Sequence, residues 1–196
     1  MKKILPFIFM SVFACQATAT VLTFDDIPSG SIENDVGGMP DYQGFNFSFT
    51  LNWIDVQDSA WNFGAYSGDY ALLNNYGGAG IIRRDNGATF TFDGLWAKQW
   101  ATTANSAGAN GLFGVLEGYK NGALAWSINT GLNGSYQYFG AQAGTIDELK
   151  LDFGNHFLVD NIALNQPAAV SAPGTLALLT LALAGLGVRR SKKTAS

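Results

Sequence analysis

The sequence predicts an all-β domain built from antiparallel strands, and three features of the chain support this prediction. Glycine is frequent, with 24 residues among 196, and aromatic residues make up 13% of the chain. Short apolar runs with a period of two recur between turn signals. No helical periodicity is found between residues 20 and 166. This combination is typical of a β-sandwich or a β-barrel.

The strand pattern is clearest where Phe45, Phe47 and Phe49 share one face of the same segment. The turns between segments contain Asn-Gly pairs, such as Asn121–Gly122, which accept positive φ and favour tight hairpins. The predicted strands are Val21–Phe24, Phe45–Trp53, Tyr70–Asn74, Gly80–Arg83, Ala88–Phe92, Leu95–Ala101, Leu112–Tyr119, Ala123–Ile128, Tyr136–Phe139, Ile146–Phe153 and Phe157–Leu164. The polar stretch from Pro28 to Tyr42 is predicted to be a loop.

The N-terminus has the pattern of a secretory signal peptide. A basic pair is followed by an apolar run from Ile4 to Cys15 and by Ala17–Thr18–Ala19, which forms a small-residue cleavage site. A lipoprotein with a lipid on Cys15 is the alternative. We therefore divide the chain into a signal peptide (1–19), a β-sandwich domain (20–166), a linker (167–172) and a C-terminal apolar segment (173–196).

Charge and cysteine content narrow the class of protein. Six of the 11 Lys and Arg residues lie in the terminal segments, which leaves five bases against 15 acids and a formal charge of −10 for the remainder. Nucleic-acid binding needs a basic surface, so no nucleic-acid partner is expected. The only cysteine, Cys15, belongs to the signal peptide, so the mature domain depends on its core or on bound metal rather than on disulfides.

The C-terminal segment has three parts. A short motif, Ala172–Pro173–Gly174, precedes an apolar run from Thr175 to Val188, and Arg189 and Arg190 follow it. As a helix, at about 1.5 Å per residue, the apolar run would span roughly 21 Å, less than a hydrocarbon core of roughly 30 Å. It predicts a short transmembrane helix with its basic end on the cytoplasmic side.

This three-part pattern resembles the PEP-CTERM sorting signal of Gram-negative bacteria. The resemblance implies export through the Sec pathway, transient anchoring in the inner membrane and processing by an exosortase. The mature protein would then reach the cell surface or an extracellular matrix, often alongside exopolysaccharide. Ala172–Pro173–Gly174 stands where the family has Pro-Glu-Pro, and a plain C-terminal membrane anchor is the alternative.

The strand region resembles galactose-binding-type jelly rolls, which are antiparallel sandwiches. The residues that carry the resemblance are Thr23–Ile27, Tyr42–Phe45, Ser67–Ala71, Phe92–Ala97, Gly118–Gly122, Ile146–Leu149 and Phe157–Ile162. In that type of sandwich the first and last strands lie together, often beside a structural Ca²⁺. The resemblance implies a calcium site formed by Asp25, Asp26, Asp160 and Asn161, with Asp69 as an extra ligand. The alternative is that these side chains cap backbone N–H groups.

The residues for nucleophilic or zinc chemistry are missing from the mature sequence. His156 is the only histidine, and no cysteine follows the signal peptide. A glycosidase needs only two carboxylates about 5–10 Å apart, and Glu33, Glu117 and Glu148 could supply them, but their spacing selects no pair. We expect that the protein is not an enzyme, with a carbohydrate-active hydrolase as the alternative.

Aromatic residues in polar stretches indicate sugar binding, because ring faces stack on pyranoses while polar groups bond the hydroxyls. The candidates are Trp53, Trp61, Tyr66, Tyr76, Arg83 and Arg84. By contrast, Trp96, Trp100 and Trp126 lie in apolar strand contexts and are predicted to be core residues. We therefore expect an exported, non-catalytic protein that binds a glycan. A purely structural matrix protein is a further interpretation.

Overall fold

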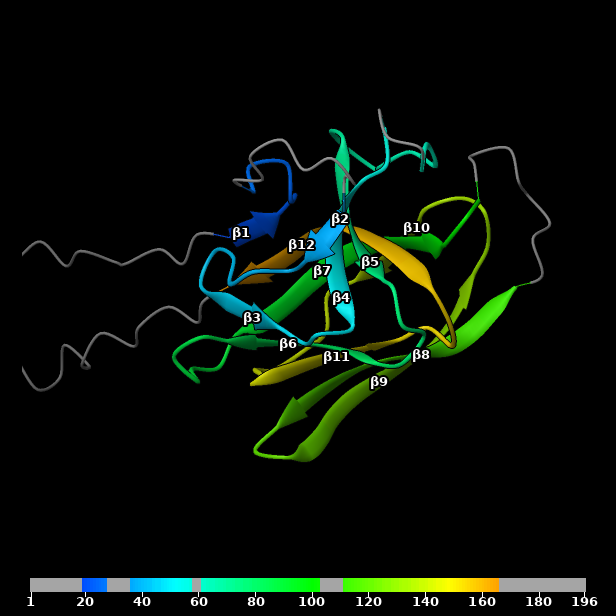
Figure 1. The fold of residues 1–196 in the computed structure, drawn as a ribbon. Coiled ribbons are helices and arrows are strands. Elements are labelled where there is room, and N and C mark those ends of the chain that lie inside the picture. The colour runs from blue at the N-terminus through cyan, green and yellow to red at the C-terminus, as the bar shows by residue number, and fades with distance from the viewer. Residues whose placement is uncertain (1–18, 28–35, 58–60, 103–110, 166–196) are drawn as a thin grey trace, which may run out of the picture. The chain divides into compact units, whose positions relative to one another are not determined.

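The computed structural model describes residues 19–27, 36–57, 61–102 and 111–165, and these ranges form a two-layer β-sandwich without helices (Figure 1). The predicted all-β fold is confirmed. Apart from Ala19, the predicted signal peptide, the linker and the C-terminal segment with Ala172–Pro173–Gly174, Arg189 and Arg190 lie outside the described residues. Within the described ranges, no helix has the length and apolar character needed to span a membrane.

Sheet A has seven strands in the order β10-β7-β12-β5-β4-β2, with β1 also paired to β12. Its strands are β1 (Ala19–Leu22), β2 (Val36–Gly38), β4 (Leu51–Asp55), β5 (Tyr70–Asn74), β7 (Thr91–Gln99), β10 (Gln137–Gly140) and β12 (Phe157–Asn165). Every pairing in it is antiparallel. Because β12 pairs with β1, β5 and β7, it is the most connected strand of the sheet.

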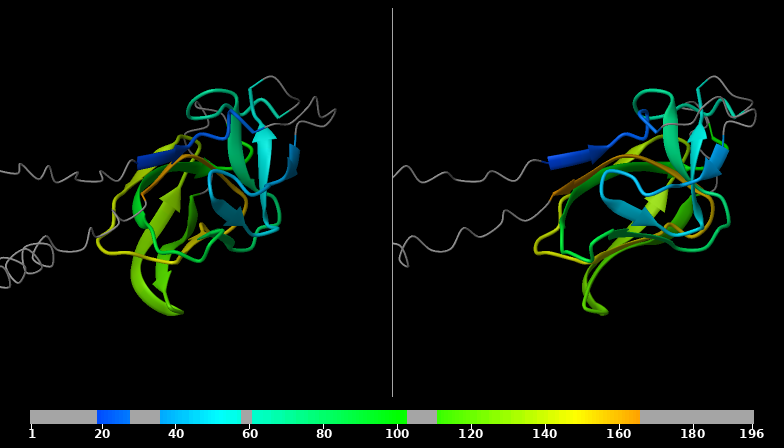
Figure 2. Two further views of the ribbon diagram at one scale, coloured as in Figure 1. Left: turned by 90° about the vertical axis from the view of Figure 1, so that its left-hand side faces the viewer. Right: turned by 60° about the vertical axis from the view of Figure 1, so that its left-hand side comes forward.

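Sheet B has five strands in the order β3-β6-β11-β8-β9. These are β3 (Phe45–Phe47), β6 (Gly80–Arg84), β8 (Leu112–Lys120), β9 (Ala123–Leu132) and β11 (Glu148–Asp152). From β5 onward the chain alternates between the two sheets, with the β8–β9 hairpin as the one exception among the described strands. This is the connectivity of a jelly-roll-type sandwich, and Figure 2 shows its two layers from two further directions.

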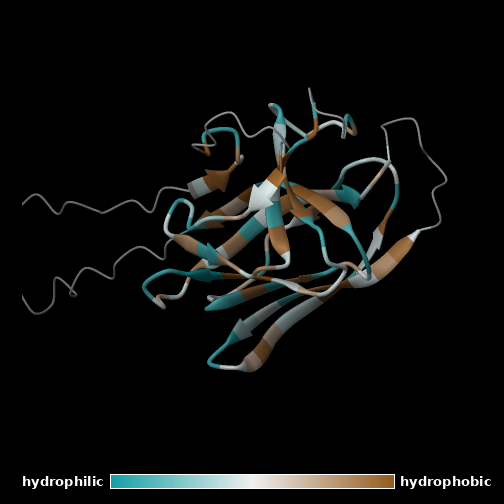
Figure 3. Cartoon of the chain, viewed as in Figure 1, coloured by the Kyte–Doolittle hydropathy of each residue, from teal (hydrophilic) through white to brown (hydrophobic). Residues whose placement is uncertain are grey.

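The core fills the space between the sheets. Leu72, Phe92 and Val159 from sheet A face Ile82 and Leu116 from sheet B, and all five are fully buried. Burying one such side chain stabilises the fold by about 1.5–3 kcal/mol relative to leaving it exposed. Hydrophobic and hydrophilic residues alternate along the strands (Figure 3), as expected when one face of each strand lines the core.

The outer face of sheet A is also covered. Ile54, Leu73 and Leu158 form a second buried cluster on this face, and Phe63 packs against it. Phe63 belongs to residues 61–69, which we call the covering loop. Sheet A is therefore buried on both faces where this loop lies, which explains why Leu51–Ile54 of β4 are buried without alternation.

One predicted strand is two strands in the structure. The segment Phe45–Trp53 divides into β3 and β4, which belong to different sheets. The chain turns at Ser48, whose carbonyl accepts the Leu51 N–H at 2.9 Å. The side chain of Ser48 also lies 2.8 Å from the Thr50 hydroxyl. The apolar alternation continues through this turn, so the pattern alone did not reveal it.

Two other predictions were wrong in their limits. The segments Ala88–Phe92 and Leu95–Ala101 contribute to one strand, β7, because Gly94 forms an irregularity within the strand instead of a hairpin turn. Gly94 has a φ of 143°, and the Tyr138 ring occupies the space that a Cβ would fill. In addition, β2 lies within the stretch 28–42 that was predicted to be a loop.

Candidate functional site

The outer face of β7 carries a row of large side chains. Successive residues of a strand point to opposite faces, so Leu95 and Ala97 enter the main core while Trp96 and Lys98 point outward. Trp100, directly after β7, joins the cluster on the same outer face. Trp96 and Trp100 are only partly buried. The prediction of core positions is therefore wrong for Trp96, which lies outside both buried clusters, whereas Trp100 packs against the smaller cluster.

The covering loop places an aromatic ring over each tryptophan of this row. Tyr66 stacks on Trp96 with ring centroids 4.1 Å apart and an interplanar angle of 14°. Phe63 meets Trp100 edge to face at 4.9 Å, and Trp61 lies 5.9 Å from the same ring. Such pairs contribute about 0.5–1.5 kcal/mol each beyond the area that they bury.

Lys98 fixes the covering loop from below. Its ammonium group donates to the Phe63 carbonyl and, at 3.0 Å, to the Thr102 carbonyl. The ring of Tyr136 lies 4.9 Å from Nζ, a cation–π contact. The side chain is almost fully buried, and burial lowers the pKa of Lys98 to about 8. Two carbonyls and one ring face thus take the place of water around this cation.

Asp160 fixes the loop a few residues further on. This fully buried carboxylate accepts the N–H groups of Tyr66 and Ser67, both at 2.9 Å, and the N–H of Asn161 at 2.6 Å. Burial raises the pKa of Asp160 to about 7, and the nearby charge of Asp25 acts in the same direction, while the three N–H groups oppose it. The carboxylate is thus a backbone anchor on the central strand of sheet A.

The first and last strands meet at this anchor, as the resemblance implied. Asp25 accepts the N–H of Asp69 at 3.0 Å. Asn161 accepts the Ser67 hydroxyl at 2.8 Å. Gly68, between these loop residues, has a φ of 62°, and the Asp25 carboxylate occupies the space of its missing Cβ. Both conditions require glycine at this position.

The predicted calcium ligands are arranged as N–H acceptors in the structure. Asp25 and Asp160 bind backbone amides of the covering loop, and Asp26 accepts the hydroxyl of Tyr42 instead. Burial, with the Asp26 hydrogen bond second, raises the pKa of Tyr42 to about 12. Among the described residues, no group of three or more His, Cys, Asp or Glu side chains is placed to hold a metal ion. Calcium binding stays a prediction.

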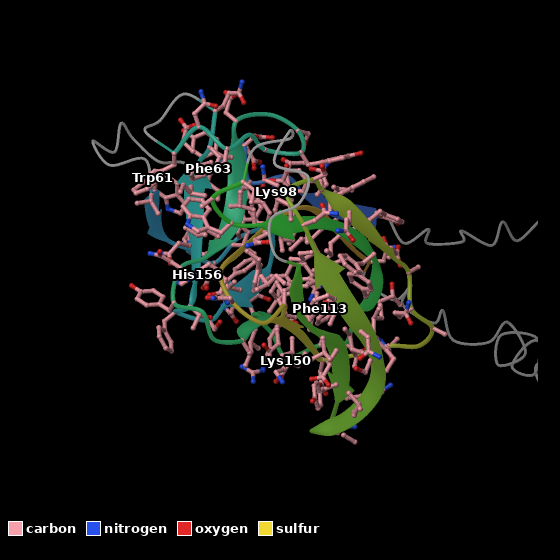
Figure 4. All side chains as sticks on the ribbon, turned by 90° about the vertical axis from the view of Figure 1, so that its right-hand side faces the viewer. Trp61, Phe63, Lys98, Phe113, Lys150 and His156 are labelled. Carbon is pink, nitrogen blue, oxygen red and sulfur yellow. The ribbon has the colours of Figure 1, made fainter. Side chains whose placement is uncertain are left out.

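A small pocket opens at one end of the sandwich, next to the covering loop. It has a volume of about 100 Å³ and is lined by Gln99, Trp100, Leu112, Asn155 and His156. Figure 4 shows His156 and Trp61 on the side of the molecule that lies to the right in Figure 1. Trp61 is 45% exposed and contacts Trp100, so an exposed ring lies next to a residue that lines the pocket.

A turn beside this pocket carries a further exposed ring, Tyr76, which contacts Phe49. Tyr76 and Phe49, 62% and 81% exposed, lie 5.9 Å apart. Gly77, the residue after Tyr76, lies against the pocket residue Asn155. A Cβ added at Gly77 would be only 3.2 Å from Asn155 Oδ1. Asn74 Oδ1 holds this turn by accepting the Gly77 N–H at 2.8 Å. We call the pocket and its rings the end patch, defined as Phe49, Trp61, Tyr76, Gln99, Trp100, Leu112, Asn155 and His156.

The other sugar-binding candidates lie elsewhere. Trp53 is 5% exposed and belongs to the main core, so it offers no face to a ligand. Arg83 donates to Glu148 at 2.9 Å on the outer face of sheet B. Arg84 is buried, with its guanidinium 5.3 Å from the Phe45 ring. Tyr66 is 42% exposed but is held on Trp96.

Sequence reasoning did not select Gln99, Asn155, His156 or Phe49 for the end patch. Gln99 and the 155–156 turn lie far apart along the chain, and only the sheet pairing of β7 with β12 brings them together. The exposed Phe49 was assigned to a strand. By contrast, Trp126 is partly buried against Phe92 at 5.3 Å and packs on the core as predicted.

The carboxylates considered for a hydrolase are held in ion pairs on sheet B. Glu117 accepts from Lys150 at 3.1 Å and from the Tyr119 hydroxyl at 3.0 Å. Burial raises the pKa of Glu117, but these donors outweigh it and leave the pKa below its ordinary value. A general acid needs a raised pKa, so Glu117 is not poised for that role. Glu33 lies outside the described residues.

Comparisons with known proteins give distant structural matches only. No family model and no curated protein matches the chain. The C-terminal family 22 carbohydrate-binding module of Clostridium thermocellum Xyn10B matches with 15% identity and a TM-score of 0.35, over 66% of this chain and 89% of that one.

Two further modules give similar values. TmCBM61, solved with β-1,4-galactotriose, has 13% identity and a TM-score of 0.35, over 62% of this chain and 88% of that one. A family 16 module has 15% identity and a TM-score of 0.29, over 64% of this chain and 88% of that one. At these TM-scores the likeness assigns the chain to none of these families.

The raised pKa of Asp160 predicts a pH dependence of stability. Between the ordinary value of 3.8 and about 7, the folded protein binds a proton here that the unfolded chain has lost. Stability from this group is therefore greatest below about pH 4 and falls as the pH rises through about 7. Asp160→Asn keeps an acceptor oxygen but does not ionise. We expect the wild type to lose unfolding free energy relative to this variant across that window.

Urea denaturation at a series of pH values measures this effect. Asp85→Asn, which makes the same change in an exposed turn, is the matched control. An Asp160→Asn profile that runs parallel to the wild type would show that the Asp160 carboxyl has no raised pKa in the folded state.

Proposed function

We propose that the β-sandwich is a non-catalytic glycan-binding domain and that the end patch is its binding surface. The observation that carries this proposal is the presence of exposed aromatic rings on segments next to a small polar pocket. Trp61, Tyr76 and Phe49 are each more than 40% exposed there. Isolated exposed apolar residues are common on proteins, but several rings grouped beside a pocket are typical of a ligand site.

The polar residues of the pocket suit the hydroxyl groups of a sugar. Gln99 and Asn155 offer amides, and His156 offers an imidazole, so donors and acceptors are both present. The Oε1 atom of Gln99 is buried and has no hydrogen-bond partner within the described part of the chain. An unsatisfied buried acceptor costs about 1–3 kcal/mol. A ligand hydroxyl that donated to Gln99 would remove this cost.

The charge of the site favours a neutral glycan. None of the described residues that line the pocket is Lys, Arg, Asp or Glu, and residues outside the terminal segments carry a formal charge of −10. An acidic polysaccharide would be repelled without basic side chains to offset its charge.

The pocket holds about three water volumes, at about 30 Å³ each. It therefore accommodates the edge of one sugar ring, while neighbouring rings of the glycan stack on Trp61 or Tyr76 outside it.

Substitutions in the end patch test the binding site. A glycan array followed by calorimetry on the full chain should identify a neutral ligand. Trp61→Ala and Gln99→Met should each weaken binding about 3- to 10-fold, because a stacked ring or a charge-free hydrogen bond contributes about 0.5–1.5 kcal/mol. Tyr138→Ala is the aromatic control, since Tyr138 is 54% exposed on the outer face of sheet A, outside the end patch.

The controls separate three results. Weaker binding of the two patch variants with unchanged binding of Tyr138→Ala supports the end patch. Loss of binding in Tyr138→Ala alone would move the site to the outer face of sheet A. The absence of any glycan ligand would contradict the proposal and leave the structural-matrix interpretation.

A structural Ca²⁺ at the junction of the first and last strands is part of the proposal. Its support is electrostatic. Asp25 and Asp160 both bind backbone N–H groups of the same turn, and the charge of Asp25 adds to the effect of burial in raising the pKa of Asp160. A divalent cation would offset this repulsion and would use carboxylate and backbone oxygens. EGTA should then lower the thermal midpoint of the full chain, by ligand linkage. An unchanged midpoint would contradict calcium binding.

We further propose that the protein is exported and that its C-terminus is a removable sorting signal. The support is the sequence pattern alone: a signal peptide, then Ala172–Pro173–Gly174, an apolar run and Arg189–Arg190. The proposed partners are an exosortase, the inner membrane during transit and an exopolysaccharide at the cell surface. A plain membrane anchor is the alternative for the same segment.

Mass spectrometry of the protein recovered from its host distinguishes these possibilities. We expect the mature chain to lack residues 1–19 and the apolar helix after Pro173. A mature chain that keeps its intact C-terminus in the envelope would contradict cleavage and favour the plain anchor. This result is independent of glycan binding, since none of these residues belongs to the end patch.

A further inference from the structure

The edges of the two sheets differ in length. Among the described strands, the edges of sheet A are formed by β10 with four residues, β2 with three and β1 with four. Sheet B ends at β3 with three residues on one side and at β9 with ten on the other. Short edge strands expose few unpaired backbone groups, which is one way proteins avoid pairing with other chains. The edge of β9 has no such protection.

β9 also lacks the charged residues that usually protect an edge. Its sequence, ALAWSINTGL, contains no Lys, Arg, Asp or Glu and no proline. The other long strands all carry charges: Asp93 and Lys98 in β7, Glu117 and Lys120 in β8, and Asp160 in β12. Among the four described strands of nine or more residues, β9 is thus the one without a charged residue. Figure 1 shows this strand at the lower margin of sheet B, beyond β8.

The stretch of β9 that could pair is regular. A register shift lies opposite Gly118–Tyr119, near the hairpin turn, and beyond it Trp126–Leu132 pairs in uninterrupted register with β8. Ser127 and Asn129 point outward and are exposed, while the aromatic ring of Trp126 lies on Gly118 of β8. Seven residues in regular extended conformation are enough to form a further antiparallel ladder.

We propose that β9 pairs edge to edge with β9 of a second copy of this chain. An antiparallel pair of identical strands about a twofold axis is isologous, so every contact is made twice. The pairing would join the two five-stranded sheets into one. This inference does not depend on the proposed function, since β9 contributes no residue to the end patch.

Charge makes this edge the least repulsive place for a second copy to bind. Residues outside the terminal segments carry a formal charge of −10, so two copies repel each other over most approaches. In the proposed contact between the two β9 strands, which we call the seam, no charged residue of one copy faces a charged residue of the other. The nearest acid on the same face, Glu117, is neutralised by Lys150 at 3.1 Å. The seam is also small, which makes the dimer weak and dependent on concentration.

Sedimentation velocity on the full chain, from about 1 to 200 µM, tests this proposal over the range expected for a weak interface. We expect a monomer–dimer equilibrium. Ser127→Lys combined with Asn129→Lys places like charges across the seam and should raise the dimer dissociation constant at least about tenfold. Ala88→Lys with Ala143→Lys adds the same charge at two exposed loop positions and should dimerise like the wild type.

Hydrogen–deuterium exchange locates the contact. Amides within residues 126–132 should become more protected as the concentration of the wild type rises, and those of the double-lysine variant should not. Thermal melting of each variant checks that the fold is intact. A wild type that stays monomeric, a Ser127→Lys/Asn129→Lys variant that dimerises normally, or association without protection of β9 would overturn the proposal.

Discussion

The outer side of sheet A depends on the buried carboxylate of Asp160. It lies on β12, which pairs with three other strands, and it accepts the N–H groups of Tyr66 and Ser67 from the covering loop. At the other end of the same loop, the buried ammonium of Lys98 donates to the Phe63 carbonyl. Each charge is stabilised by backbone dipoles, so the loop backbone is fixed by the sheet beneath it.

The fold class was predictable because alternation and turn chemistry are local properties of the chain. The assignment of strands to sheets was not local. Phe45–Trp53 has one continuous alternation, yet the turn at Ser48 sends its halves into different sheets. Gly94 has the opposite effect, since it allows one strand to continue through an irregular position. In both cases contacts with distant segments, absent from any local window, decide the outcome.

The tryptophans show why the candidate site was only partly predictable. Trp53 has a polar neighbour in Asn52 but points into the core. Trp96 has apolar neighbours, Leu95 and Ala97, and for that reason points outward, because adjacent residues occupy opposite faces. Judging an aromatic residue by its immediate neighbours therefore reverses its orientation in a strand. The meeting of the first and last strands was anticipated because it follows from the type of sandwich.

The two sheets leave different surfaces for function. Sheet A is covered on its outer face by a loop that several buried hydrogen bonds fix, so a ligand there would have to displace Tyr66 from Trp96 at the cost of their stacking. Within the described ranges, the turns at the strand ends hold Tyr76 and His156 without contributing to the ladders. Sheet B keeps its outer charges paired and one long edge open. Ligand contacts are therefore expected at the strand ends and protein contacts at the edge of β9, where neither disturbs the core.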